Sequence, residues 1–236
     1  WSDETIRWIR SRLPARTILR AHRHRLGVAM IGRGALEGEG ARAVAKDFAR
    51  AVAVFDQRGC VSPHVVFLER GGQVEPEAWA KLLSGAFSDL EGDLPSGEVF
   101  PEEAVALQQF RGSAELREGL GDGVVFHGGD GAPWTVAVQE RGPLEPSCLN
   151  RSVRFVPVDG FASALSALSE WAPFLQTVGV AGFGPEAEEV VESLARLGAS
   201  RIVSIPQIPW PRPWWHHDGS GPLLDLVRWT DLEGIS

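Results

Sequence analysis

The chain has 236 residues, of which 44% are hydrophobic and 23% charged, a balance typical of a soluble globular protein. It carries 23 basic and 31 acidic residues, a net charge of −8, which argues against nucleic-acid binding because such proteins present Lys and Arg to phosphates. No run of about 18 apolar residues is present, so we expect no membrane span. Two cysteines, Cys60 and Cys148, cannot build a disulfide framework, and we expect a reducing, cytoplasmic location.

The first residue is Trp1 and the single methionine is Met30. A translated protein begins with Met, so we expect this sequence to be a trimmed product or a fragment.

The first half of the chain predicts helices separated by short strands. Ile6 and Ile9 recur at helical spacing and predict a helix over 2–12. Two β-like runs, 17–20 and 26–31, flank the basic stretch RAHRHR. Within 39–55, apolar residues at the i, i+4, i+7, i+8, i+11 spacing predict a helix with one buried face. A buried strand is expected over 65–68, and two further helices over 75–90 and 101–118.

The second half alternates strands and helices before its composition changes. Strands are expected over 124–126, 134–138, 153–158, 177–181 and 201–205, and helices over 161–171 and 185–197. Residues 205–222 hold five Pro and three Trp in 18 residues, which excludes a helix or a central strand. We expect this segment to pack on the body of the protein and a short helix over Leu223–Trp229 to follow it. The alternation predicts a layered α/β fold.

Cys60 is the sharpest candidate for chemistry. It lies in a loop between a buried helix and a buried strand, between Gly59 and Ser62-Pro63. A thiol on a loop held by a rigid scaffold suits a covalent nucleophile; the alternative is a small buried apolar residue. Arg58 and His64 are neighbours that could lower the thiol pKa. We interpret Cys148 as a packing residue.

Other polar motifs leave alternatives open. His217-Asp218 could supply an acid or base, or Asp218 could cap a helix. RAHRHR could hold a cofactor phosphate or form a solvated turn. GVAGFG at 179–184 has the spacing of an ordinary strand-to-helix turn rather than of a dinucleotide site. The scattered histidines and the absence of a CxxC pair predict no metal site.

The run VAKDFARAVAVFDQRGCVSPHVVFLE at 44–69 resembles the cysteine region of the bioluminescence-type long-chain acyl-CoA reductases, which belong to the aldehyde dehydrogenase superfamily. Similar stretches follow in the family's order, among them PEEAVALQQFRGSAELR, LNRSVRFVPV and WWHHDGSGPLLDLVRWTDLEG. The resemblance covers nearly the whole chain.

This resemblance implies a mechanism. Cys60 matches the nucleophile, which would attack an acyl-CoA or acyl-carrier thioester; hydride from NADPH would then release a fatty aldehyde. Glu145 falls where relatives place a ribose-binding glutamate, and His22 lies in the basic stretch expected near the cofactor. Ser62, His217 and Asp218 would lie at the substrate side or mouth of the site. Ala21 stands roughly where aldehyde-oxidising relatives carry the glutamate that activates a hydrolytic water.

The resemblance also implies a domain organisation. Residues 1–55 would end a Rossmann-like nicotinamide-cofactor domain, so that most of the cofactor site would be absent. Residues 56–205 would form a three-layer αβα catalytic domain, and residues 206–236 a Trp/Pro-rich tail. We expect a homo-oligomer or a partner subunit. Two alternatives stay open: a non-reducing acyl-accepting or subunit-interaction fragment, and an aldehyde-oxidising or acyl-phosphate-reducing relative.

Overall fold

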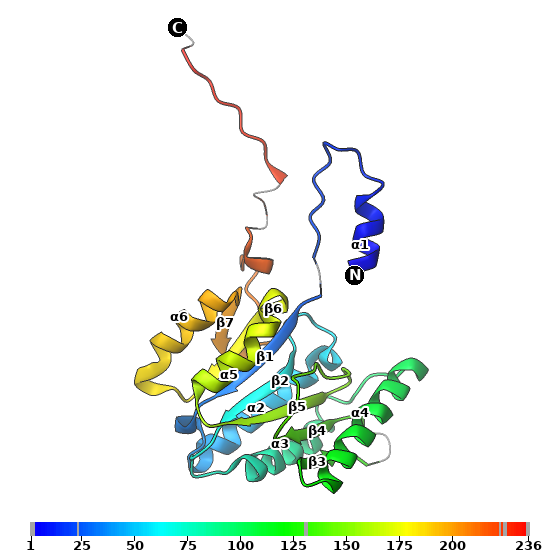
Figure 1. Ribbon diagram of the computed structural model, residues 1–236, viewed down its shortest axis with the longest axis vertical. Coiled ribbons are helices and arrows are strands. Elements are labelled where there is room, and N and C mark those ends of the chain that lie inside the picture. The colour runs from blue at the N-terminus through cyan, green and yellow to red at the C-terminus, as the bar shows by residue number, and fades with distance from the viewer. Residues whose placement is uncertain (1–2, 23, 130–131, 222, 224–225, 235–236) are drawn as a thin grey trace.

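A seven-stranded sheet forms the centre of the chain in the computed structural model, which describes residues 3–22, 24–129, 132–221, 223 and 226–234 (Figure 1). The strand order is β3-β4-β5-β2-β1-β6-β7. Strands β3 and β4 are antiparallel, and every other neighbouring pair is parallel. The strands are β1 (Leu26–Ile31), β2 (Pro63–Glu69), β3 (Gly123–His127), β4 (Thr135–Gln139), β5 (Ser152–Val158), β6 (Leu175–Ala181) and β7 (Arg201–Ser204).

Helices cover both faces of the sheet and give the expected three-layer αβα arrangement. Helices α2 and α3 pack on one face, where Phe48 and Trp79 enter the core. Helices α5 and α6 pack on the other face through side chains such as Leu168 and Leu194. Helix α4 lies against β3 and β4 (Figure 1). The helices are α1 (Asp3–Arg10), α2 (Gly38–Ala53), α3 (Pro76–Leu90), α4 (Pro101–Gly119), α5 (Phe161–Leu168) and α6 (Ala187–Leu197).

The central strands are apolar on both faces because helices cover both. Along β1, Val28 and Met30 face the α5–α6 side while Ala29 and Ile31 face the α2–α3 side. A strand buried on both sides reads as a continuous apolar run rather than an alternating one. This explains why the run LGVAMI contains no charged residue.

Residues 26–55 are built into the same sheet and core as the later elements. Strand β1 lies between β2 and β6, and α2 contributes Phe48 to the core shared with α3. The expected division at residue 55 therefore runs through a continuous core. Whether residues 3–22 belong to a separate cofactor domain stays a prediction.

Three local expectations differ from the structure. Residues 17–20 do not form a strand; Ile18 is 75% exposed, and no described strand pairs with this segment. The helix expected over 161–171 ends as α-helix at Leu168 and continues as a 3₁₀ segment, Ser169–Phe174, because Pro173 lacks the N–H that an α-helix needs. Over Leu223–Trp229, residues 224–225 lie outside the described residues and 227–229 are not helical. Trp229 is 84% exposed, and so short a helix is marginal without a surface to pack on.

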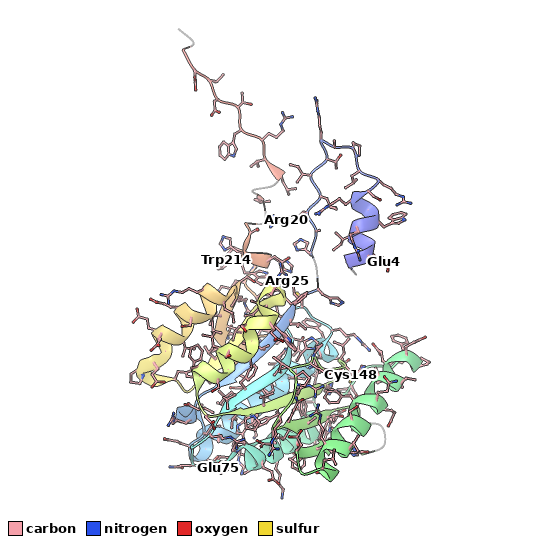
Figure 2. All side chains as sticks on the ribbon, in the orientation of Figure 1. Glu4, Arg20, Arg25, Glu75, Cys148 and Trp214 are labelled. Carbon is pink, nitrogen blue, oxygen red and sulfur yellow. The ribbon has the colours of Figure 1, made fainter. Side chains whose placement is uncertain are left out.

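The Trp/Pro segment packs on the body at its start and again at His217 and Asp218, which contact residues near the start of the sheet. Ile205 and Ile208 are buried in the core beside α2, whereas Trp210 and Trp214 are exposed. The described residues 226–234 extend away from the sheet (Figures 1 and 2). Among the helices of the described ranges, none combines the length and the apolar composition that crossing a membrane would need.

Candidate active site

Cys60 lies in the loop between α2 and β2, at the edge of the sheet where β1, β2 and β6 begin. It is an exposed residue. It borders a cavity of about 650 Å³. The described residues that line the cavity are His24, Arg25, Leu26, Gln57, Arg58, Gly59, Cys60, His64, Pro146, Ser147, Leu149, Trp171 and Phe174.

The loop reaches this position through an unusual backbone. Phe55, Asp56 and Gln57 have φ values of 59°, 48° and 65°, in the left-handed region that costs a non-glycine residue about 1 kcal/mol or more. The buried Gln57 side chain compensates. Its Nε2 donates to the carbonyls of Pro63 and Ser152, each at 2.7 Å, and its Oε1 accepts from Ser152 N at 3.0 Å. The amide therefore ties the turn to the first residues of β2 and β5.

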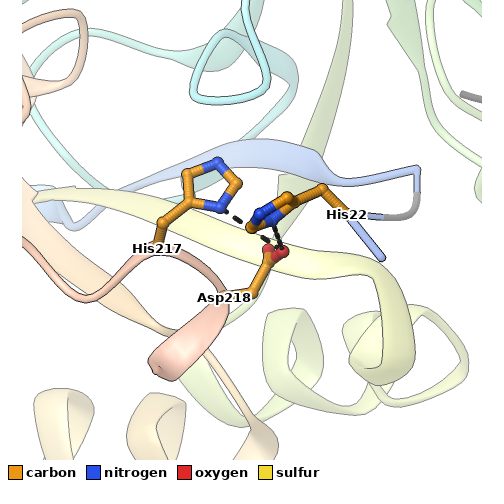
Figure 3. Close-up of side chains that lie close together, drawn as sticks. All are labelled: His22, His217 and Asp218. Atoms are coloured by element: carbon orange, nitrogen blue, oxygen red, sulfur yellow. Dashed lines mark hydrogen bonds and ion pairs between the residues drawn. The ribbon is translucent and has the colours of Figure 1, made fainter. Parts of the chain in front are cut away.

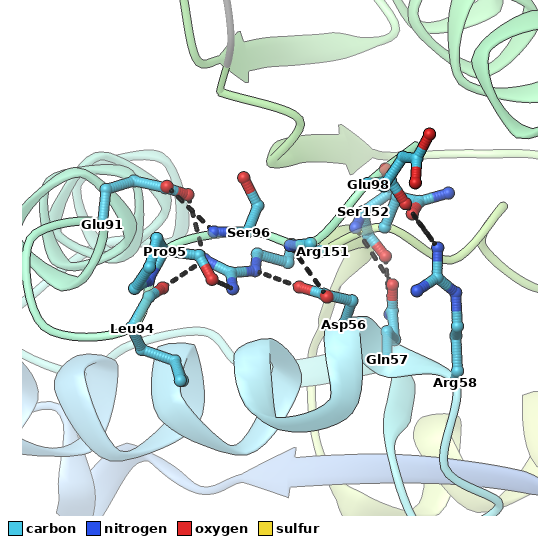
Figure 4. A network of polar contacts seen from close by, with 12 residues as sticks. Asp56, Gln57, Arg58, Glu91, Leu94, Pro95, Ser96, Glu98, Arg151 and Ser152 are labelled. Atoms are coloured by element: carbon cyan, nitrogen blue, oxygen red, sulfur yellow. Dashed lines mark hydrogen bonds and ion pairs between the residues drawn. The ribbon is translucent and has the colours of Figure 1, made fainter. Parts of the chain in front are cut away.

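A buried arginine holds the same turn from the other side (Figure 4). Arg151 is 1% exposed, and its Nε donates to Asp56 Oδ1 at 2.9 Å. Its NH1 donates to Glu91 Oε1 at 2.9 Å and to the carbonyl of Leu94 at 2.9 Å. This network joins the Cys60 loop to the end of α3 and to the segment before β5.

The C-terminal segment brings a histidine to the thiol. Cys60 Sγ lies 3.7 Å from His217 Nε2. Asp218 follows in a turn with a φ of 56°, and its Oδ2 lies 3.4 Å from His217 Nδ1 (Figure 3). The ring of His217 contacts His22 and Trp215 edge-on, with centroid separations of 4.5 and 4.9 Å. Two of the residues expected at the mouth, His217 and Asp218, are thus beside the predicted nucleophile.

Asp218 does not cap a helix; its carboxylate binds side chains. His22 Nδ1 and Arg25 Nε each lie 2.7 Å from one of its oxygens, and Gln176 Nε2 donates to Oδ1 at 3.0 Å. Arg25 also donates to the carbonyl of Pro173 at 2.8 Å. Two residues of the basic stretch RAHRHR, His22 and Arg25, therefore anchor Asp218. His22 is placed in this cluster, and its expected role in cofactor binding stays a prediction.

The charges around the thiol set the direction of each pKa. Burial raises the pKa of Cys60, and the negative charge of Asp218 raises it further. Burial lowers the pKa of His217, with Asp218 opposing this effect in part. Burial by itself would raise the pKa of Asp218, but the hydrogen bond with His22 and the charge of Arg25 outweigh it and hold that pKa below its usual range. The resting pair is therefore a neutral thiol and a neutral imidazole beside a carboxylate.

Two further predicted residues lie near the cavity but not beside the sulfur. Glu145 immediately precedes Pro146 and Ser147, which line the cavity; its Oε2 is 3.3 Å from Arg154 NH2, and its side chain is 59% exposed. Ser62 is buried in the turn behind Cys60, where its N–H donates to the Gly59 carbonyl at 2.9 Å. Ser62 is not among the described residues that line the cavity. The roles expected for both stay predictions.

The neighbours of Cys60 in sequence do not activate it. Arg58 directs its guanidinium to Glu103 at 2.8 Å. His64 lines the cavity, but burial lowers its pKa to about 4, and its Nδ1 pairs with Ser147 Oγ at 3.0 Å. Gln176 reaches the site from the start of β6, a position that no local motif in the sequence marks.

The remaining motifs have structural positions. Cys148 is half-buried against Phe110 and Ala114 of α4, in agreement with packing, and burial raises its pKa. The GVAGFG turn lies at the carboxyl ends of β1 and β6, the edge opposite Cys60. There Gly182 O accepts from Gly34 N at 3.1 Å, and a Cβ on Gly182 would meet Gly32 O at 2.4 Å. The chain's own backbone fills this turn.

His22, His217 and Asp218 could in principle hold a metal ion, since one ligand atom of each lies within 4.8 Å of the others. Arg25 places a positive charge 2.7 Å from Asp218 Oδ1, which opposes a cation at that carboxylate. The absence of a metal stays a prediction, and elemental analysis of the purified protein tests it.

Comparison with solved structures shows the fold. A proline utilization A (PutA) structure with proline bound in remote sites matches with a TM-score of 0.66 and 14% identity over 86% of this chain and 21% of that one. An indole-3-acetaldehyde dehydrogenase of P. syringae, solved with NAD+ and IAA, matches with a TM-score of 0.60 and 10% identity over 78% of this chain and 38% of that one. An NAD-dependent aldehyde dehydrogenase from Burkholderia multivorans matches with a TM-score of 0.51 and 15% identity over 79% and 36%. The chain thus has the fold of aldehyde dehydrogenase domains and spans 21% to 38% of the length of these structures.

The sequence comparison is more specific. A search of curated proteins found no match. The family model for acyl-CoA reductase (LuxC) matches residues 1–229, nearly the whole chain. The chain therefore belongs to the LuxC family of acyl-CoA reductases, with the fold of the aldehyde dehydrogenase superfamily.

Proposed function

We propose that this chain is the catalytic part of an enzyme that reduces a long-chain acyl thioester, on CoA or on an acyl carrier, to a fatty aldehyde. One observation carries the proposal: in a member of this family, an exposed cysteine on a fixed loop borders a cavity of about 650 Å³. Leu26, Leu149, Trp171 and Phe174 give the cavity apolar walls, which suit an acyl chain.

Cys60 is the nucleophile in this proposal. Its sulfur attacks the thioester carbonyl, the bond to the CoA sulfur breaks, and the acyl group remains on Cys60 as a new thioester. The backbone N–H of Cys60 supplies one donor to the oxyanion that develops. The hydrogen bonds of Gln57 and Arg151 hold the loop and so fix the position of the Cys60 sulfur. Little conformational entropy is therefore lost when the sulfur attacks.

A nicotinamide cofactor, NADPH in this proposal, supplies the hydride that reduces the acyl group when it is bound. The residues present fit one end of such a cofactor. The Glu145 carboxylate adjoins the cavity and uses Oε2 for Arg154 while remaining 59% exposed, which leaves it available to a ribose hydroxyl. Arg25 adds a positive charge and His24 an imidazole at the cavity wall. The GVAGFG turn is occupied by backbone and does not contribute.

The cavity favours reduction over hydrolysis. No described residue lining it is an Asp or a Glu, so the carboxylate that activates water in aldehyde-oxidising relatives has no counterpart among these residues, consistent with Ala21. An acyl group on Cys60 then persists long enough to be reduced. In the alternative, an acyl-accepting fragment without reductase activity, Cys60 is acylated in the same way but the acyl group is not reduced. The oligomeric state and the cytoplasmic location stay predictions.

Intact-protein mass spectrometry after incubation with a long-chain acyl-CoA tests the first step. We expect one acyl adduct on the wild type and on Cys148→Ala, and none on Cys60→Ala. An adduct that persists in Cys60→Ala overturns the assignment of the nucleophile. Adding NADPH to the acylated protein tests the second step: release of fatty aldehyde supports the reductase, and a stable adduct favours the acyl-accepting fragment.

A further inference from the structure

We propose that His217 is a catalytic residue that takes the proton of Cys60 as the sulfur attacks and passes it to the departing thiolate, and that Asp218 is its positioning residue. The inference rests on the proposed acylation of Cys60 and deepens it. It gives the HDG motif at 217–219 a chemical role that sequence alone left open.

The geometry places a nitrogen against the reacting sulfur. His217 Nε2 lies 3.7 Å from Cys60 Sγ, a long hydrogen bond of the kind that tightens when a catalytic site binds its substrate. Of the other described imidazoles at this edge, His22 pairs with Asp218 and His64 pairs with Ser147, while His24 lies in the cavity wall. Among the histidines of the described residues, His217 is the one with a recorded contact to this thiol.

The hydrogen bonds of Gln176 assign the proton on the ring. Its Nε2 donates to Asp218 Oδ1 at 3.0 Å and lies 3.4 Å from His217 Nε2. An amide nitrogen donates and does not accept, so Nε2 of His217 is the acceptor and the ring proton sits on Nδ1. The alternative orientation of the amide would place Gln176 Oε1 against the carboxylate, which is repulsive. The single lone pair of Nε2 thus faces both Gln176 and Cys60, and the proton of Cys60 displaces the long contact with Gln176 when it is transferred.

The carboxylate of Asp218 holds the other side of the ring. Its Oδ2 is 3.4 Å from His217 Nδ1. That nitrogen is buried and has no hydrogen-bond partner among the described residues, so Asp218 acts on the ring through its charge. Asp218 itself is only 9% exposed at its side chain. It is fixed by His22 and Arg25 from the segment before β1, at 2.7 Å each. The imidazolium that forms on His217 is thus stabilised by a carboxylate that is held in place.

The charged and titratable groups that face His217 allow it to take up the Cys60 proton and release it again. They are Asp218, His22 and Arg25, with the Cys60 thiol on the opposite side. In the resting state the thiol keeps its proton, so no thiolate forms before substrate arrives. During attack the S–H bond breaks, the proton moves to Nε2, and the Cys60 S–C bond forms. When the bond from carbon to the CoA sulfur breaks, the same proton leaves Nε2 for that sulfur, and no oxidant or reductant is consumed.

The rate of Cys60 acylation at pH 7, followed by intact mass, tests the proposal. We expect His217→Gln to acylate at least 100-fold more slowly than wild type, in line with the range of 10²–10⁴ for proton transfer by a placed side chain. His216→Gln is the matched control, because His216 is an exposed neighbour, and we expect it within twofold of wild type. Acylation of His217→Gln at the wild-type rate overturns the proposal.

Chemical rescue separates chemistry from folding. We expect added imidazole to accelerate acylation of His217→Ala at least tenfold and to leave wild type and His216→Gln unchanged. For Asp218→Asn, we expect a 10- to 100-fold loss and a pH–rate profile whose acid limb moves to lower pH, because Asp218 raises the pKa of His217. No rescue together with an unshifted profile shows a structural role and overturns the assignment.

Alkylation of Cys60 by iodoacetamide distinguishes failure of this inference from failure of the proposed function, since it requires no acyl substrate. At pH 6.5 we expect His217→Gln to be alkylated at least fivefold more slowly than wild type. If wild type is alkylated with this dependence but never acylated, the proposed function is wrong and the pairing of Cys60 with His217 is supported. If acylation occurs and neither reaction depends on His217, the function stands and the inference is wrong.

Discussion

His64 shows how a single buried side chain couples stability to pH. It lies at the start of β2, and burial lowers its pKa from the ordinary 6.5 to about 4. The unfolded chain therefore binds the proton more tightly than the folded one. The stability linked to neutral His64 is complete above about pH 6.5 and declines as the pH falls towards 4.

We expect this residue to contribute a loss of about 2 kcal/mol in unfolding free energy between pH 7.5 and pH 5. Urea unfolding of wild type and His64→Asn at both pH values measures it, since the variant lacks the titrating group and other groups cancel in the difference. Equal losses in the two proteins would contradict the prediction.

At the scale of single residues, the sequence marks candidate site residues where the pattern is local. Cys60 and the HDG motif are recognisable because each lies within a short, specific run of residues. Gln176 was not predicted to be part of the site, because a glutamine before a strand has no local pattern. His64 was expected only as a sequence neighbour that could lower the thiol pKa. The register of β2 places His64 in the cavity wall, and that of β6 places Gln176 beside Asp218.

The connection between α2 and β2 is the element on which the site depends, and Arg151 is its principal support. We expect Arg151→Ala to lower the unfolding free energy by about 3–5 kcal/mol, because it leaves Asp56 and Glu91 without their buried partner. Arg196→Ala is the control: it removes an exposed pair with Glu192, and we expect a change of about 0.5 kcal/mol or less. Urea unfolding measures both variants. Similar losses of unfolding free energy in Arg151→Ala and Arg196→Ala would show that burial of the Arg151 network does not contribute to stability.

Gly27 sets how closely β1 approaches the Cys60 loop. A Cβ there would lie 2.5 Å from the carbonyl oxygens of Val61 and Ser62. We expect Gly27→Ala to cost about 1–3 kcal/mol and to slow acylation of Cys60, because the loop must move to relieve the contact. Gly40→Ala in α2, where the nearest atom is 3.8 Å away, should instead stabilise by about 0.5–1 kcal/mol and leave acylation unchanged. Acylation of Gly27→Ala at the wild-type rate would show that the loop tolerates the shift.

At the scale of elements, segments with a periodic apolar pattern were predicted correctly, whereas residues 17–20, which have no partner strand to pair with in the described part of the chain, were not. The helices α2, α3, α4 and α6 and the buried strands follow the spacing of their apolar residues, because packing against the sheet imposes that spacing. Residues 17–20 have strand-like composition but no pairing partner among the described strands. A strand requires a neighbour, and composition does not supply one.

Across the whole molecule, the site lies at the edge where the parallel strands begin. Ligands of open α/β sheets commonly bind at the carboxyl ends of the strands, where the GVAGFG turn lies. Here that edge is closed by backbone packing, and the chemistry is at the opposite edge, joined by the segments before β1 and after β7. The layered fold could be predicted from the alternation of elements. The meeting of the two outer segments could not, because it depends on single contacts between residues about 190 positions apart.

Removing the tail tests this arrangement. We expect a chain that ends at Pro209 to unfold cooperatively, because Ile205 and Ile208 remain in the core, and to acylate Cys60 at least 100-fold more slowly, because His217 and Asp218 are gone. A chain that ends at Gly221 keeps both residues and should acylate near the wild-type rate. Thermal unfolding and intact mass measure the two effects. Full acylation of the shorter chain would show that the tail is dispensable for chemistry.

The separation of 157 residues between Cys60 and His217 has a consequence for biosynthesis. During translation the thiol leaves the ribosome long before the imidazole is made, and until then it has no proton acceptor at its side. In the proposed mechanism, a nascent chain that has not yet reached His217 therefore carries the Cys60 thiol without its proton acceptor. Acylation of Cys60 would become fast only once the segment around His217 has been made and has docked.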